Sequence, residues 1–111
     1  MKLLTSLLDL PYQIFKDLED VDVYHVRKPA DKEAPYAVWM ESGDASFNSD
    51  NQRSERVLEG TLDFYTLDDL DPALDLLEEA MSKMGASWQL VAVQDEPETN
   101  LIHYTWEWTV M

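Results

Sequence analysis

The 111-residue sequence predicts a single α+β domain, in which a small antiparallel or mixed sheet of about five strands carries two helical segments. Residues 102–110 alternate strictly between apolar and polar side chains, the period of a strand with one buried face. Residues 72–84 instead repeat apolar side chains every three or four positions, as a helix does. Four more alternating segments and a leucine-rich N-terminus complete the order α-β-β-β-α-β-β. The simplest arrangement packs both helical segments on one face of the sheet.

The N-terminal segment, residues 1–18, has helical spacing, but Pro11 interrupts it. Proline disfavours helical geometry in the residue before it and is tolerated in a first turn. Two short helices, about 2–9 and 11–18, or one kinked helix satisfy the pattern, and we expect a break or kink near Pro11. We expect mature sequence here and not a signal peptide, because Asp9 interrupts the apolar run and no small-residue cleavage site follows. No apolar run approaches the ~20 residues that a membrane span needs.

Two strands are expected next, at residues 21–26 and 35–41, with a polar loop between them. The second strand has apolar side chains on both faces: Ala37 and Trp39 on one, and Tyr36, Val38 and Met40 on the other. We therefore expect a helix or a neighbouring subunit to cover each face.

Residues 42–55 are the one long polar segment, and the sequence predicts a loop there. Phe47 is its only large apolar residue. A loop of this length is either a simple connection between strands or a segment that orders against a partner, with Phe47 as an anchor.

Residues 56–67 form the third predicted strand. Leu58, Leu62 and Phe64 share one face, and Glu59, Thr61 and Asp63 share the other. Gly60 lies on the apolar face and marks either a bulge or a close approach.

The helix at residues 72–84 has a start signal in Asp71 and Pro72 and a stop signal in Gly85. Its expected apolar stripe comprises Leu70, Leu74, Leu77, Met81 and Met84. A strand at 87–94 and the last strand should form an antiparallel hairpin across Pro97, whereas the third and fourth strands need not be neighbours.

The net charge of −15 is unevenly distributed, because residues 57–111 contain twelve acidic side chains and one basic side chain, Lys83. Such a surface repels phosphates and argues against ordinary DNA or RNA binding. The negative charge has three possible roles: it keeps the protein soluble, it attracts a basic protein partner, or it prevents DNA from sticking to the surface. The absence of cysteine excludes disulfides and thiolate metal sites.

Catalytic patterns do not emerge from the sequence. His25 and His103 lie outside any nucleophile motif, so we interpret both as surface or interface residues. Asp68, Asp69 and Asp71 lack the glycine and glutamate spacing of a calcium loop, and a carboxylate pair such as Glu59 and Asp63 arises by chance in so acidic a chain. We expect a protein that is not an enzyme, with no cofactor and no metal.

Several stretches together resemble the tail terminator proteins, also called tail completion or head–tail joining proteins, of long-tailed phages and prophages of Gram-positive bacteria. They run in order from about residue 21 to the end of the chain: VYHVRKP (23–29), APYAVWMESGD (34–44), SDNQ (49–52), LEGTLDFYTLDDLD (58–71) and IHYTWEWTV (102–110).

This resemblance implies a structural virion protein that forms a ring, typically a hexamer, on the finished tail tube and joins it to the head connector. Its partners would be its own copies, the tail tube protein and connector proteins, and DNA would pass through the lumen without specific binding. It would occupy the host cytoplasm during assembly and then the head–tail junction of the virion, without a membrane. The candidate interface residues are Trp39, Phe47, Asp50, Asn51, His103 and Glu107.

Two other functions remain open. The first is an acidic DNA mimic that inhibits a basic nucleic-acid enzyme, because the negative charge is concentrated after residue 57. The second is another head-completion or minor tail component.

Overall fold

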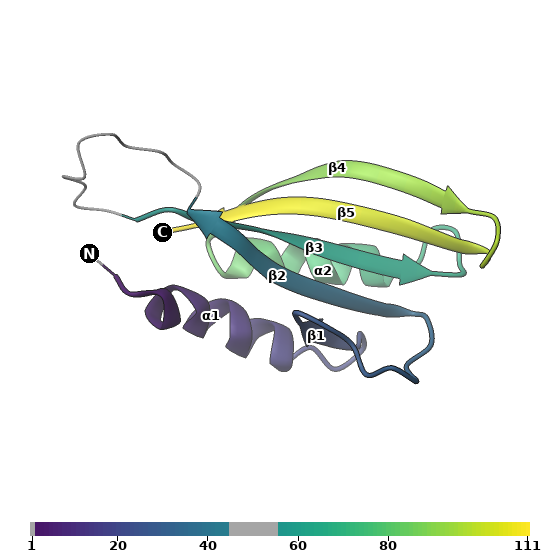
Figure 1. Ribbon diagram of the computed structural model, residues 1–111, viewed down its shortest axis with the longest axis horizontal. Coiled ribbons are helices and arrows are strands. Elements are labelled where there is room, and N and C mark those ends of the chain that lie inside the picture. The colour runs from purple at the N-terminus through teal and green to yellow at the C-terminus, as the bar shows by residue number, and fades with distance from the viewer. Residues whose placement is uncertain (1, 45–55) are drawn as a thin grey trace.

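The computed structural model describes residues 2–44 and 56–111, which form a five-stranded mixed sheet and two helices (Figure 1). The elements are α1 (Leu4–Lys16), β1 (Val23–His25), β2 (Tyr36–Asp44), β3 (Leu58–Thr66), α2 (Ala73–Lys83), β4 (Ser87–Glu96) and β5 (Leu101–Val110). The predicted fold class and element order are confirmed.

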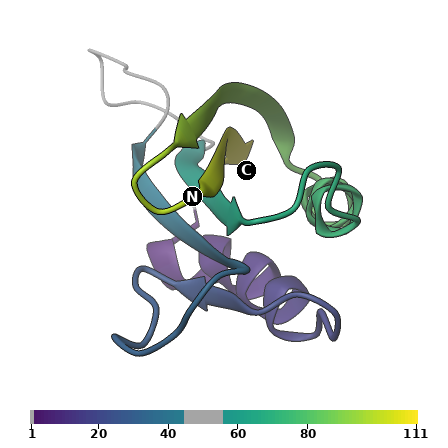
Figure 2. The ribbon, with the colours of Figure 1, turned by 90° about the vertical axis from the view of Figure 1, so that its right-hand side faces the viewer.

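The strands lie in the order β1-β2-β3-β5-β4. Strand β1 runs parallel to β2, and the three other pairs are antiparallel. β4 and β5 therefore form the expected hairpin, and β5 separates β3 from β4. Figure 2 shows how strongly the sheet curls, with α1 beneath it and α2 at its side.

The core lies between the sheet and the two helices. Trp39 of β2 and Trp106 and Trp108 of β5 are almost completely buried. Leu7 and Phe15 of α1 and Leu77 and Met81 of α2 belong to the same buried cluster. The apolar face predicted for the last strand is thus the centre of the core, and burial of its large aromatic side chains is a main source of stability.

Of the two arrangements that the sequence left open at Pro11, the structure has the single helix, because α1 continues through this residue from Leu4 to Lys16. Leu7, Pro11 and Phe15 are four residues apart and all buried. Their shared face packs on the core, and this packing offsets the one helical hydrogen bond that proline cannot donate. Neither helix in the described ranges has the length and apolar character needed to cross a bilayer.

The predicted start and stop of α2 are confirmed. The Asp71 carboxylate accepts a hydrogen bond from the Ala73 N–H, 2.9 Å away, and Gly85 ends the helix with a positive φ of 73°. Leu70 does not belong to the apolar stripe, because it lies in the turn before the helix and is 84% exposed. Ala73 and Ala80 complete the buried face instead.

Strand β2 is longer than predicted and includes residues 42–44, which we expected in the loop. Residues 45–55 lie outside the described ranges. A bulge between Glu41 and Gly43 shifts the register of β2 on β3. Both helices pack on the face that carries Ala37 and Trp39, as expected for helical segments on one face of the sheet. Among the residues that the structure describes, no helix lies on the other face of β2, which leaves a neighbouring subunit as the predicted cover.

Candidate functional site

We call the sheet face opposite the helices the open face. Its central part consists of Tyr36, Val38 and Met40 on β2, Glu59, Thr61, Asp63 and Tyr65 on β3, and His103, Thr105, Glu107 and Thr109 on β5. None of the five strands contains a lysine or an arginine. The ionisable groups that the central strands add to this face are therefore acids, tyrosines and one histidine, and the face repels anions.

His103 lies in a polar cluster on the open face. Its Nε2 is 2.7 Å from Oδ1 of Asp63 on β3, and its Nδ1 is 3.6 Å from Oε2 of Glu96 on β4. The Thr105 hydroxyl donates to the same Asp63 oxygen at 2.8 Å. Because the cluster joins β3, β4 and β5, it fixes the register of the acidic half of the sheet.

The cluster does not have the geometry that activates a nucleophile. In an acid–histidine–hydroxyl relay, the acid and the hydroxyl bind opposite nitrogens of the imidazole. Here Asp63 and Thr105 both approach Nε2 of His103, and the Thr105 hydroxyl donates to Asp63. The hydroxyl proton therefore points toward a carboxylate and away from the histidine.

Aromatic rings form a ladder across three strands at one end of the open face. Tyr65 lies between Tyr36, at a centroid distance of 5.0 Å, and the stacked His103 ring, at 4.1 Å. Burial, reinforced by the charge of nearby Asp63, raises the pKa of Tyr65 to about 12. The pKa of Tyr36 is also raised, mainly by burial. Both phenols thus remain neutral at physiological pH and serve as packing groups.

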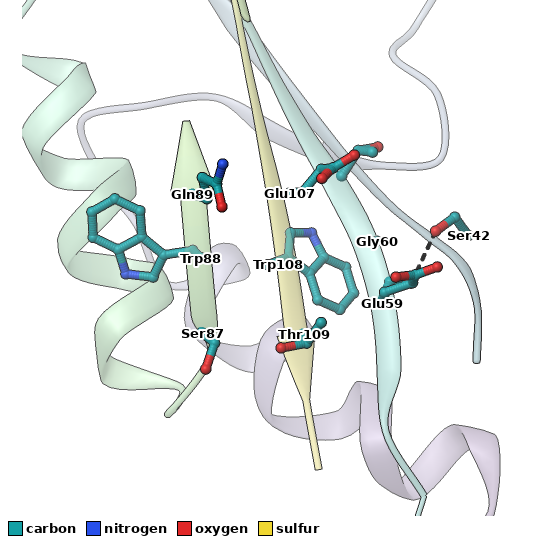
Figure 3. A pocket seen from close by; sticks show the side chains of 10 residues that line it. Ser42, Glu59, Gly60, Ser87, Trp88, Gln89, Glu107, Trp108 and Thr109 are labelled. Carbon is teal, nitrogen blue, oxygen red and sulfur yellow. Dashed lines mark hydrogen bonds between the residues drawn. The ribbon is translucent and has the colours of Figure 1, made fainter. Parts of the chain in front are cut away.

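A hollow of about 270 Å³ lies at the other end of the central strands, around Gly60 (Figure 3). Its lining residues are Ser42, Glu59, Gly60, Thr61, Ser87, Trp88, Gln89, Glu107, Trp108 and Thr109. In Figure 3, Trp88 points toward α2, whereas Trp108 lies against β3 beside Gly60. The Ser42 hydroxyl donates to the Glu59 carbonyl at 3.2 Å, which ties the bulged part of β2 to the rim.

The carboxylates of Glu59 and Asp63 do not form a glycosidase-type pair. They are four residues apart on one strand, which separates their backbones by roughly 13 Å at ~3.3 Å per residue. Glycosidase carboxylates lie about 5–10 Å apart. Within residues 2–44 and 56–111, no group of three or more His, Cys, Asp or Glu side chains could hold a metal ion.

Strand β4 forms the long edge of the sheet, opposite the three-residue edge strand β1. It is ten residues long, and its segment 87–94 has no charged residue, proline or glycine. The exposed fractions of Leu90, Val91 and Val93 are 43%, 41% and 55%. Natural proteins usually protect such edges with lysine, proline, a bulge or a covering segment. The only one of these devices within β4 itself is the bulge at Val91.

The predicted interface residues separate into three groups. His103 and Glu107 lie on the open face, where Glu107 is exposed and His103 is held by the Asp63 hydrogen bond. Trp39 is only 2% exposed and stacks on His25 in the core, so it has no free surface to offer. Phe47, Asp50 and Asn51 lie outside the described residues.

Tyr65 and the exposed part of β4 are surface features that were not predicted from the sequence. Tyr65 continues the alternation of Thr61 and Asp63, so its place on the polar face could have been predicted from the strand period. No pattern in the sequence indicates that Leu90 and Val93 are exposed. Both pair with core residues of β5 and would be buried if α2 extended over them.

No protein-family model matches the chain, and no curated protein sequence matches it. The open face, the β4 edge and the sequence resemblance described above are therefore the features that bear on function.

Proposed function

We propose that this chain is a ring-forming tail terminator, a structural virion protein that caps the tail tube and joins it to the head connector. The sequence resemblance suggests this role, and it covers most of the chain from residue 21 onward. The observation that carries the proposal is a sheet with an acidic open face and a long edge strand whose segment 87–94 is uncharged. The edge supports contacts between copies, and the face suits a DNA passage.

The open face supports passage of DNA without binding. Glu59 and Glu107 are exposed there, and no strand residue offers a cation to a phosphate. DNA in a lumen lined by this face would meet like charge at short range, which lowers friction and non-specific adhesion.

A DNA mimic is the second candidate, because the same acidic surface could bind a basic nucleic-acid enzyme. Several acids, however, are engaged within the molecule. Glu41 pairs with His25, Asp63 with His103, Asp71 with Thr66 and Ala73, and Glu78 with the Trp106 indole. These acids stabilise the fold and are not free to imitate a regular row of phosphates, which favours the structural role.

Electron microscopy and light scattering of the purified chain, alone and with tail tube protein, test the proposal. We expect closed rings with a central hole, and binding of those rings to tube ends. A monomer at every concentration, with and without tube protein, would contradict it. Capture by a basic nuclease or polymerase that is lost at high salt would favour the DNA mimic instead.

A further inference from the structure

We infer that copies of this chain associate head to tail, with the free edge of β4 in one copy bonding to the free edge of β1 in the next. This inference rests on the proposed ring and specifies the contact that builds it. It follows from the state of the β4 edge, the strand directions, the exposed apolar groups and the distribution of charge.

The β4 edge is the surface most ready to accept another strand. An edge strand presents a row of unpaired N–H and C=O groups, and ten residues allow several intermolecular hydrogen bonds. The chain has a net charge of −15, yet segment 87–94 is uncharged. Two copies can therefore approach here without bringing acids of this segment together.

The strand directions favour β1 as the partner of β4. β1 is parallel to β2, and three antiparallel pairings separate β2 from β4, so β1 and β4 run in opposite directions. A copy rotated about an axis that lies along the strands keeps the direction of its β1. Its β1 then meets β4 of the first copy in the antiparallel sense, and the sheet continues from copy to copy.

Apolar groups are exposed on the helix side at both ends of the sheet. Leu90 and Val93 of β4 lie on the face that carries the core, beyond the cover of α2. At the other end, α1 packs against β1 and exposes Leu10 and Tyr12. In a continuous sheet, α1 of the next copy lies over the uncovered part of β4, and both sets of apolar side chains lose contact with water.

Charge complementarity supports the same arrangement. Next to β4, a groove of about 450 Å³ on the exposed side of α2 is lined by the half-buried Trp88 ring, three acids and one cation, Lys83. Its net charge is therefore negative. The loop after β1 contains three of the chain's eight basic residues, Arg27, Lys28 and Lys32, and two acids, Asp31 and Glu33. Lys32 pairs with Asp22, so Arg27 and Lys28 are the cations that this loop offers to another copy. Head-to-tail contact brings this loop toward the acidic side of α2, which steers association and fixes its direction.

Symmetric pairing of β4 with β4 is disfavoured by the same charges. It would place two α2 helices, each with Asp75, Glu78 and Glu79, on the same side of one interface. It would also close after two copies, because an isologous contact uses the same surface twice. Only a heterologous contact can continue around a ring.

The first test places lysines on the β4 edge of the full chain, in the double variant Val91→Lys and Val93→Lys. Sedimentation and light scattering should show self-association weakened by about tenfold or more, because each lysine adds charge to the edge and removes apolar contact. Leu70→Lys, at an exposed leucine away from β4, is the matched control and should assemble normally. Circular dichroism and urea unfolding should show that all of these proteins are folded.

The second test exchanges charges across the contact. Arg27→Glu and Glu79→Lys should each weaken association, and the double variant should recover part of it. Asp69→Lys, at an exposed acid outside α1, β1 and β4, controls for the change in net charge of Glu79→Lys. If Arg27→Glu has no effect while the β4 lysines abolish assembly, the symmetric β4 contact is correct and the head-to-tail contact is wrong.

The remaining outcomes separate this inference from the proposed function. If the double variant Val91→Lys and Val93→Lys still forms rings, the β4 contact is wrong, but the proposed ring is still supported. Rings that respond as expected but never bind tube ends support the contact and contradict the terminator function. A wild-type monomer at all concentrations overturns both.

Discussion

Gly60 lies in the sheet where an added side chain would have no room. It pairs with Trp108 across β3 and β5, and a Cβ there would overlap both the indole ring and the Met40 carbonyl oxygen. The sequence left two interpretations of this glycine, a bulge or a close approach. The structure confirms the close approach and places the bulge on β2, opposite it, between Glu41 and Gly43.

Gly60→Ala should therefore destabilise the protein by about 1–3 kcal/mol, the usual cost of overpacking a filled core. Urea unfolding monitored by tryptophan fluorescence measures the change. Glu59→Ala, at the exposed neighbouring position, should change stability by less than about 0.5 kcal/mol. Equal stability of Gly60→Ala and the wild type would show that Trp108 can move aside.

Tyr65 of the aromatic ladder makes the stability of the folded protein depend on pH in the alkaline range. Because its pKa is about 12 in the folded protein and 10 ordinarily, the folded state holds the phenol proton more tightly than the unfolded state does. Its contribution to stability is complete below pH 10 and is lost as the pH rises toward 12.

Tyr65→Phe should remove this part of the alkaline destabilisation while leaving stability at pH 7 little changed. Urea unfolding at a series of alkaline pH values, together with tyrosinate absorbance, measures the effect. Tyr12→Phe, at an exposed tyrosine of α1, is the control. An unchanged alkaline profile in Tyr65→Phe would contradict the assignment.

At the scale of elements, most strands and α2 were predictable because their patterns are local. Alternation and end signals depend only on neighbouring residues, so β3, β5 and α2 agree with the sequence to within a few positions. The sequence left open whether residues 4–16 form one helix or two, because the buried face that accommodates Pro11 packs on core residues distant in sequence, such as Trp39 against Phe15. The exclusion of Leu70 from the stripe of α2 likewise depends on how the turn before the helix approaches the sheet.

The start of α2 supports a prediction at this scale. The Asp71 carboxylate binds both the Ala73 N–H and the buried Thr66 hydroxyl, at 2.9 and 2.7 Å. Asp71→Ala should therefore cost about 1–2 kcal/mol of stability, because it removes a helix cap and leaves the Thr66 hydroxyl with one partner fewer. Thermal unfolding checks this value, with the exposed Asp69→Ala as control. Equal losses in the two variants would contradict the capping role.

At the scale of the whole molecule, the strands differ in charge from the loop after β1. The strands contribute acids and no lysine or arginine, and three basic residues gather in the loop after β1. If copies form the proposed ring with the open face toward the lumen, this pattern lets DNA slide and directs the contact between copies.

The double variant Glu59→Lys and Glu107→Lys tests whether the open face lines the lumen through which DNA passes. Both positions are exposed on the open face, so the double variant should fold and assemble normally but slow the ejection of DNA from virions. Lysines at Asp69 and Glu98, which lie outside the strands, provide a control with the same net charge. Equal ejection rates in the two double variants would count against a lumen lined by the open face.

The sequence by itself determined the fold class, the element order, the inward and outward faces of β3 and β5, and the acidic character of the chain. These properties depend on residue type and on spacing along the chain. The tertiary structure decided the position of β5 between β3 and β4, the burial of Trp39, the cluster around His103 and the exposure of Leu90 and Val93. Each of these depends on which distant segments meet, and local periodicity does not record how far a helix extends over its sheet.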